Sequence, residues 1–278
     1  MRVTVFGVDR RFIYAAEYLS RRGYRAERYA PGAGLAPILL LPVPASRDGA
    51  TVTGFPGVPI GDLLAARPRL ILGGNLSGGF TAAARRAGIA VRDYMNAETF
   101  VLKNASLTSD AALGILLSES SAAPRENPTA IIGFGRIGKF LSRGLLSLGC
   151  PVTVFARDPR DRTMATLIGA RARDTEDLGE AGALAPYRTV VNTAPARLVP
   201  RAAVGALAPG SLLLELASGE GNLPNPDPGS GVTLRRANGL PGRVFPESAG
   251  LALGEAAHDL IREVFPDGRA EEEKTDSP

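Results

Sequence analysis

The part of the chain most suited to bind a ligand is a glycine-rich turn. Residues 133–138 read Gly-Phe-Gly-Arg-Ile-Gly, and an apolar run, residues 130–132, leads directly into them. Apolar residues at helical spacing follow, so the pattern predicts a strand, a turn and a helix. In such a unit the first glycine permits a tight turn, the second lets the backbone approach a diphosphate, and the third lets the helix pack on the strand. The diphosphate meets the N–H groups at the helix start. The alternative is a glycine turn without a ligand. We expect a dinucleotide to contact Gly133, Gly135, Arg136, Ile137 and Gly138.

The residues after the next strand bear on which dinucleotide is bound. An NAD site usually ends this strand with Asp or Glu, which holds the ribose hydroxyls. Here the apolar run at residues 152–155 is followed by Ala156 and then Arg157, whose guanidinium suits the 2′-phosphate of NADP. Asp158, one residue further on, keeps NAD as an alternative, and Arg157 has the alternative of a solvated loop residue. We predict NADP as the cofactor.

Small and amide-bearing residues follow two more predicted strands, at residues 189–191 and 212–214. Ligands of parallel sheets gather at the carboxyl ends of the strands. The alternative for each residue is a helix cap or a turn. The residues expected near a ribose or a nicotinamide amide are Asn192, Thr193, Ala217 and Ser218.

Short apolar runs alternate with helical patterns along the whole chain, which predicts an α/β fold with two doubly wound domains. We place a first domain, for substrate or partner, at residues 1–103 and a Rossmann dinucleotide-binding domain at residues 125–247. A bridging helix and a Ser/Ala/Pro-rich linker occupy residues 104–124. Residues 248–266 read as a final helix, and the strongly charged residues 267–278 as a disordered tail.

The composition excludes several classes of protein. Of 278 residues, 45% are apolar and 22% charged, which is typical of a globular chain. The net charge of +4 comes from arginines spread along the sequence, and this favours small anionic ligands over nucleic acid. The alternative is that the arginine content reflects only the composition of the source genome. One cysteine excludes an internal disulfide, and no run of about twenty uninterrupted apolar residues predicts a membrane span. We therefore expect a cytoplasmic protein with no membrane, nucleic-acid or metal partner.

Several segments together resemble a known family, the A subunit of dipicolinate synthase, which makes dipicolinate during bacterial spore formation. The most telling block is the Gly-Leu-Pro-Gly turn at residues 239–242 with the Pro-Glu-Ser-Ala-Gly that follows it. The likeness covers nearly the whole chain. Its other segments are residues 7–11, 41–46, 104–110, 133–138, 191–193 and 215–218.

The resemblance implies a flavodoxin-like amino-terminal domain beside the Rossmann domain. It also implies an enzyme that oxidises a dihydrodipicolinate-type precursor to dipicolinate with NAD(P)⁺, in sporulation. A second, flavoprotein-like B subunit is the implied partner. A homo-oligomer is left open by the sequence.

The substrate of such an enzyme is a small anionic dicarboxylate. We expect it in the cleft between the domains, with Arg11 binding a carboxylate, since this residue follows the first strand. Ser46, Asn104 and Thr108 are expected to supply neutral hydrogen bonds, from a loop and from the bridging helix. The alternative for each of these residues is a cap or a surface group.

Aromatisation also requires a base, and we expect Asp9 or Glu247 to take the proton. The family usually has lysine where Glu247 stands. Relatives that oxidise 2-hydroxy acids have a catalytic histidine near this point, whereas the single histidine here, His258, lies in the final predicted helix. Two alternatives therefore remain: a non-catalytic dinucleotide-binding regulatory or scaffold subunit, and a dehydrogenase for another cyclic imino acid or 2-hydroxy acid.

Overall fold

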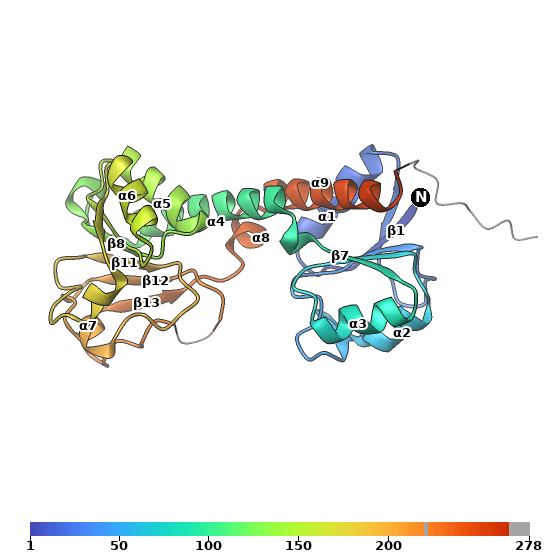
Figure 1. Cartoon of the computed structure of the whole chain (residues 1–278), viewed down its shortest axis with the longest axis horizontal. Helices are drawn as coiled ribbons and strands as arrows, with labels where there is room; N and C mark the ends of the chain where they lie inside the picture. The colour runs from blue at the N-terminus through green and yellow to red at the C-terminus, as the bar shows by residue number, and fades with distance from the viewer. Residues whose placement is uncertain (220–221, 267–278) are drawn as a thin grey trace, which may run out of the picture. The chain divides into compact units, whose positions relative to one another are not determined.

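A computed structural model of the chain describes residues 1–219 and 222–266. It divides into two compact units, each α/β (Figure 1). The first unit contains Met1–Asn104 together with the segment that begins at Pro241, and the second contains Ala105–Leu240. The carboxyl-terminal segment thus returns to the first unit. The predicted tail at residues 267–278 lies outside the described residues.

The first unit is built on a five-stranded parallel sheet with the order β2-β1-β3-β6-β7. This is the order of flavodoxin-like folds. Its switch point, where the order of successive strands across the sheet reverses, lies between β1 and β3. The predicted flavodoxin-like fold is confirmed. The strands are β1 (Arg2–Val5), β2 (Arg25–Arg28), β3 (Ile38–Leu40), β6 (Leu70–Gly73) and β7 (Ala90–Asp93).

Helices cover both faces of this sheet (Figure 1). On one face α1 (Arg11–Arg21) and α9 (Pro246–Val264) bury apolar residues against alternate strand positions, such as Val3 and Val5. On the other face α2 (Ile60–Ala65) and α3 (Gly78–Arg86) bury theirs. The remaining elements are the hairpin of β4 (Thr51–Val52) and β5 (Phe55–Pro59), the 3-10 turn η1 (Tyr94–Asn96) and the short helix α8 (Leu240–Val244).

The second unit is built on a six-stranded parallel sheet with the order β10-β9-β8-β11-β12-β13. Numbered within the unit, the order is 3-2-1-4-5-6, that of dinucleotide-binding Rossmann domains, and its switch point lies between β8 and β11. The predicted Rossmann fold is confirmed. The strands are β8 (Thr129–Ile132), β9 (Val152–Phe155), β10 (Arg171–Arg173), β11 (Thr189–Asn192), β12 (Leu212–Glu215) and β13 (Thr233–Arg236).

Helices connect β8 to β9, β9 to β10 and β11 to β12, as is usual for crossovers between parallel strands. Helix α5 (Arg136–Ser147) buries Leu141 and Leu145 on one face of the sheet, where α6 (Pro159–Leu167) also lies (Figure 1). Helix α7 (Arg201–Gly205) covers the opposite face. Two 3-10 turns, η2 (Pro124–Glu126) and η3 (Thr175–Gly179), complete the unit.

Helix α4 (Glu98–Glu119) is the long apolar helix of the chain. With 22 residues and a mean hydropathy of 1.2 over its most apolar 18, it is long and apolar enough to cross a membrane by length and composition alone. It is also packed within the protein: Ala112 and Leu116 are buried, and Leu113 lies against Gly144 of α5. Of that apolar window, 39% is buried inside the structure.

Candidate functional site

Two of the three glycines in the predicted loop are required by the fold itself. Gly133 has a φ of +93°, and a Cβ on it would lie 2.8 Å from Thr193 Oγ1. A Cβ on Gly138, in the first turn of α5, would collide with the carbonyl oxygen of Gly133. These two glycines let β8 turn sharply into α5 and let the helix pack against that turn.

The third glycine, Gly135, is different. It is exposed, its φ of −70° is not left-handed, and nothing lies within 4 Å of the position that a Cβ would take. Internal packing therefore does not explain why this position is glycine. An approaching ligand would explain it, because the missing side chain gives access to the start of α5, whose N-cap is this same residue and supplies no capping side chain. The loop therefore fits the diphosphate of a dinucleotide.

Thr193 holds this turn in place from the neighbouring strand. Its Oγ1 lies 3.0 Å from the carbonyl oxygen of Ile132 and 3.2 Å from that of Gly133. The pairing of β11 with β8 places Asn192 beside Ile132, so the next residue reaches the end of β8. Thr193 thus lies at the switch point, with its hydroxyl bonded to the turn.

The loops after β11 and β12 are tied together by a buried carboxylate. Glu215 is 2% exposed and accepts hydrogen bonds from Asn192 Nδ2 (2.8 Å) and from the backbone N–H groups of Ala217 (3.1 Å) and Leu223 (2.9 Å). Burial raises the pKa of Glu215, although these hydrogen bonds oppose the shift. Asn192, 1% exposed, also bonds both the N–H and the carbonyl of Ala194. The Asn192 amide is therefore committed to loop shape, whereas Ser218 is exposed.

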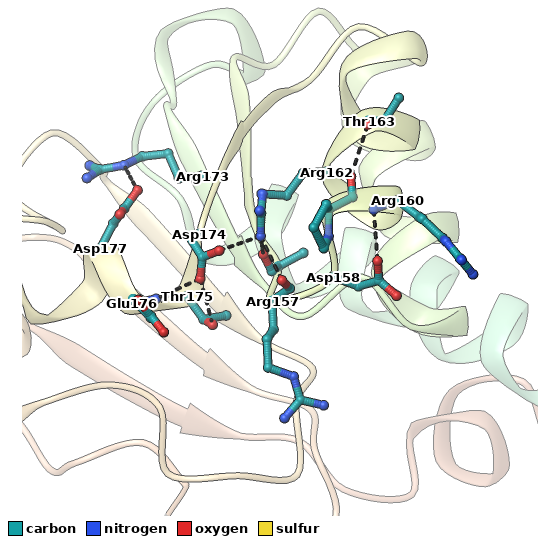
Figure 2. A network of polar contacts seen from close by, with 12 residues as sticks. Arg157, Asp158, Arg160, Arg162, Thr163, Arg173, Asp174, Thr175, Glu176 and Asp177 are labelled. Carbon is teal, nitrogen blue, oxygen red and sulfur yellow. Dashed lines mark hydrogen bonds and ion pairs between the residues drawn. The ribbon is translucent and has the colours of Figure 1, made fainter.

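At the end of β9, Arg157 and Asp158 are both exposed but differ in their partners (Figure 2). Asp158 Oδ1 accepts a hydrogen bond of 2.8 Å from the N–H of Arg160, so its carboxylate caps α6. The guanidinium of Arg157 points away from this network, and no partner for it is found among residues 1–219 and 222–266. Ala156, 3% exposed, fills the position at which an NAD site would carry its acidic residue.

In the first unit, Asp9 and Arg11 lie at the switch point, after β1. Arg11 donates from Nε to Asp9 Oδ1 (3.0 Å) and from Nη2 to Asp9 Oδ2 (2.7 Å), so the pair is bidentate. Burial acts to lower the pKa of Arg11, but the hydrogen bond and the charge of Asp9 outweigh it and raise this pKa. Gly242 of α8 packs directly on the guanidinium, since a Cβ there would lie 2.5 Å from Arg11 Nε. The Gly-Leu-Pro-Gly motif, predicted as a turn, thus runs into a short helix that covers Arg11.

The other predicted substrate residues are placed as follows. Ser46 lies in the segment that follows β3, and its hydroxyl bonds Asp48 Oδ1 (3.0 Å) and the N–H of Gly49 (2.9 Å). Glu247 is exposed in the first turn of α9. Asn104 and Thr108 lie one helical turn apart on α4, so they share a helix face.

Three polar residues of the second unit escaped sequence reasoning. Glu215 had a signal: an acidic residue ends an otherwise apolar strand, Leu-Leu-Leu-Glu. Arg162 and Asp174 had none, because they are twelve residues apart on different elements and only the fold brings them together. Both lie beside Arg157 (Figure 2).

We compared the chain with family models, with curated proteins and with solved structures. No family model matches the chain. The A subunit of dipicolinate synthase from Bacillus subtilis is 26% identical over 168 residues, which are 60% of this chain and 56% of that protein. The crystal structure of the A subunit of dipicolinate synthase from Bacillus halodurans has a TM-score of 0.80 at 20% identity and covers 94% of this chain and 97% of its own.

The resemblance to the A subunit of dipicolinate synthase is confirmed. The sequence match spans just over half of the Bacillus subtilis protein, and the structural match, at this identity, shows the fold. The same fold occurs in the apo structure of D-lactate dehydrogenase from Escherichia coli, with a TM-score of 0.67 at 12% identity over 96% of this chain and 98% of that one. The architecture is therefore one that a dehydrogenase also has.

Proposed function

We propose that this chain is an NADP-dependent oxidoreductase that acts as the A subunit of a dipicolinate synthase. The observation that carries the proposal is Gly135, an exposed glycine at the start of α5 that no neighbouring protein atom requires. The likeness to the Bacillus subtilis protein, which is named as a dipicolinate synthase subunit, supports dipicolinate as the product. We take the reaction to be oxidation of a dihydrodipicolinate-type precursor, in the cytoplasm of a sporulating cell. That relative is named as one subunit of its synthase, which supports a partner for this chain, and a flavoprotein-like B subunit is our candidate.

The oxidation removes two hydrogens from neighbouring ring atoms of the substrate. Bound NADP⁺ supplies the hydride acceptor, and the second hydrogen leaves as a proton to a carboxylate of the protein. Asp9 and Glu247 are our candidates for this base. Asp9 is already bonded to Arg11 through both oxygens, whereas Glu247 is exposed with no partner among the described residues, so we favour Glu247. Because the product is aromatic, a weak base is sufficient.

Arg11 is our candidate for the group that binds a substrate carboxylate. Asp9 takes the Nε–Nη2 edge of the guanidinium and orients it. Nη1 has no hydrogen-bond partner in the part of the chain that the structure describes, and so remains for an anionic ligand. Ser46, Asn104 and Thr108 are proposed to add neutral hydrogen bonds to the substrate.

The reaction is tested directly by mixing the purified chain with NADP⁺ and freshly generated precursor, with and without the B subunit. Absorbance of reduced nicotinamide and of the pyridine product is followed together. Equal rates of appearance of the two products, with the chain alone, support the proposal. Binding of NADP⁺ without turnover under every condition contradicts it.

The position of the single histidine supports a second candidate function, that of a non-catalytic dinucleotide-binding subunit. His258 Nδ1 is hydrogen-bonded to Tyr24 Oη at 3.1 Å, between α9 and the start of β2, and so is occupied away from the switch-point loops. Without a histidine base, a non-catalytic dinucleotide-binding subunit is the alternative. Turnover that appears only with the B subunit, and survives loss of both Asp9 and Glu247 carboxylates, would favour it.

A further inference from the structure

Arg162, on α6, bonds to the backbone of the turn that follows β9 (Figure 2). Its Nη1 donates to the carbonyl oxygens of two successive residues, Ala156 at 2.8 Å and Arg157 at 2.7 Å. The same nitrogen is bonded to Asp174 Oδ2. One guanidinium nitrogen therefore fixes the orientation of two consecutive peptide groups at the end of the strand.

Asp174, which follows β10, uses both of its carboxylate oxygens in hydrogen bonds. Its Oδ1 accepts the N–H of Glu176 at 3.1 Å and so caps η3, while Oδ2 faces Arg162. Its hydrogen bond to the Glu176 N–H and the charge of Arg162 lower the pKa of Asp174. The carboxylate therefore ties the ends of two adjacent parallel strands, β9 and β10, through Arg162.

The charged side chains near this turn differ in their partners. The charge of Arg162 is balanced by Asp174, and its side chain is 26% exposed, so it is poorly placed to meet a ligand. Asp158 is committed to capping α6. Arg157 alone of these three has an exposed charged group with no partner among the described residues, and its own backbone carbonyl is one of the two that Arg162 binds.

We propose that Arg162 and Asp174 are positioning residues for the 2′-phosphate of NADP, acting through Arg157. The inference rests on the proposed function, since it requires a dinucleotide on the second unit. Arg157 supplies the charge–charge contact with the phosphate. The Arg162–Asp174 pair fixes the turn from which Arg157 extends. Less conformational entropy is then lost when Arg157 binds the phosphate, so the affinity for NADP⁺ is higher.

The test measures dissociation constants for NADP⁺ and NAD⁺ by calorimetry on the whole chain. Four proteins are compared with the wild type: Arg157→Met, Arg162→Met, the double variant, and Arg201→Met. Arg201 is a matched control, because it is also bonded to an aspartate of the second unit, Asp227, but lies in α7. Circular dichroism and the melting temperature establish that each variant is folded.

We expect Arg157→Met to weaken NADP⁺ binding by about 10-fold or more, the loss of one charge-assisted contact, and to leave NAD⁺ within about 2-fold. Arg162→Met is expected to weaken NADP⁺ selectively, by about 5-fold or more. In the double variant, Arg162→Met should add almost nothing, because it acts through a side chain that is already absent. Arg201→Met should change neither constant.

The inference is overturned if a folded Arg162→Met variant weakens NADP⁺ and NAD⁺ equally, or if its effect is undiminished when Arg157 is absent. If Arg162→Met does not fold, Asp174→Asn takes its place and is expected to cause a smaller selective loss of NADP⁺; an unchanged ratio overturns the inference. Failure of the wild type to bind either dinucleotide would instead remove the proposed function.

Discussion

Asp9 accepts hydrogen bonds from Nε and Nη2 of Arg11, so only Nη1 of this guanidinium is left for the proposed substrate carboxylate. Replacing Arg11 by alanine is expected to raise the substrate KM by about 10-fold or more through the lost charged hydrogen bond. The dissociation constant for NADP⁺ should stay within about 2-fold, because the dinucleotide loop belongs to the other unit. Steady-state kinetics and calorimetry measure the two quantities.

The matched control is Arg10→Ala, the adjacent arginine. Its Nη2 lies 3.4 Å from Tyr14 Oη, and this contact is exposed. Its KM should equal that of the wild type. An unchanged KM for Arg11→Ala would remove Arg11 from the substrate site.

His258 provides a pH-dependent contribution to stability that can be isolated, since the chain has no other histidine. Burial, with the positive charges of Arg22 and Arg262, lowers its pKa, and Asp259 opposes this. Between the lowered pKa and the ordinary value of about 6.5, the unfolded chain binds more protons than the folded one. The free energy of unfolding should therefore fall as pH drops from 7.5 through this window.

His258→Gln should lose this component. Urea unfolding at pH 7.5 and pH 5.5 gives the comparison. The wild type is expected to lose more stability on acidification than the variant does. Equal losses would show that the environment of His258 does not shift its titration.

At the scale of elements, the packing of α9 on α1 depends on small residues. A Cβ on Gly250 would collide with the carbonyl oxygen of Arg11 and lie 2.6 Å from Tyr14 Cβ. Gly250→Ala is therefore expected to destabilise the protein by about 1–3 kcal/mol, the usual cost of overpacking. The shift in the denaturation midpoint measures the effect.

Gly114→Ala in α4 is the matched control for this substitution. Nothing lies within 4 Å of the Cβ position there, so only helix propensity changes, and that favours alanine by up to about 1 kcal/mol. Equal midpoints for the two variants would contradict the close packing of α9 on α1.

Most central strands could be predicted from sequence because they are continuous apolar runs, such as Leu70–Gly73 and Thr129–Ile132. The strands that the sequence pattern missed include three at sheet edges: Arg25–Arg28, Arg171–Arg173 and Thr233–Arg236. Their charged residues give no apolar signal, because an edge strand is only partly covered. Pairing with a neighbouring strand, not local sequence, makes them strands.

The candidate site divides in the same way. Glycine spacing predicted the turn at residues 133–138, since local backbone geometry demands it. The hydrogen-bond partners of the side chains could not be predicted, because they depend on how the strands are paired in register. Asn192, for example, is occupied by Glu215 only because β11 and β12 place these two residues side by side.

At the scale of the whole molecule, the first unit is discontinuous in sequence. Buried residues of α9, such as Leu253 and Ile261, belong to the same core as the strands of that unit. A chain that ends after Gly239 should therefore lose the cooperative unfolding of the first unit and become protease-sensitive within residues 1–104.

The second unit should still bind the dinucleotide in this truncated chain, because Ala105–Leu240 contains the whole Rossmann sheet, and the truncation removes only its last residue. Limited proteolysis and calorimetry on the same sample test both halves of the prediction. Resistance of residues 1–104 to protease after truncation would contradict the assignment of α9 to the first core.

The measurement that tests the central claim most directly is calorimetric titration of NADP⁺ and NAD⁺ into the wild type and Gly135→Ala. The wild type is expected to bind. The variant should still fold, since its Cβ meets no protein atom, yet bind NADP⁺ at least about 10-fold more weakly because the Cβ occupies the path of the diphosphate. Equal affinities in the two proteins, or no binding of either dinucleotide to the wild type at millimolar concentration, would contradict the account.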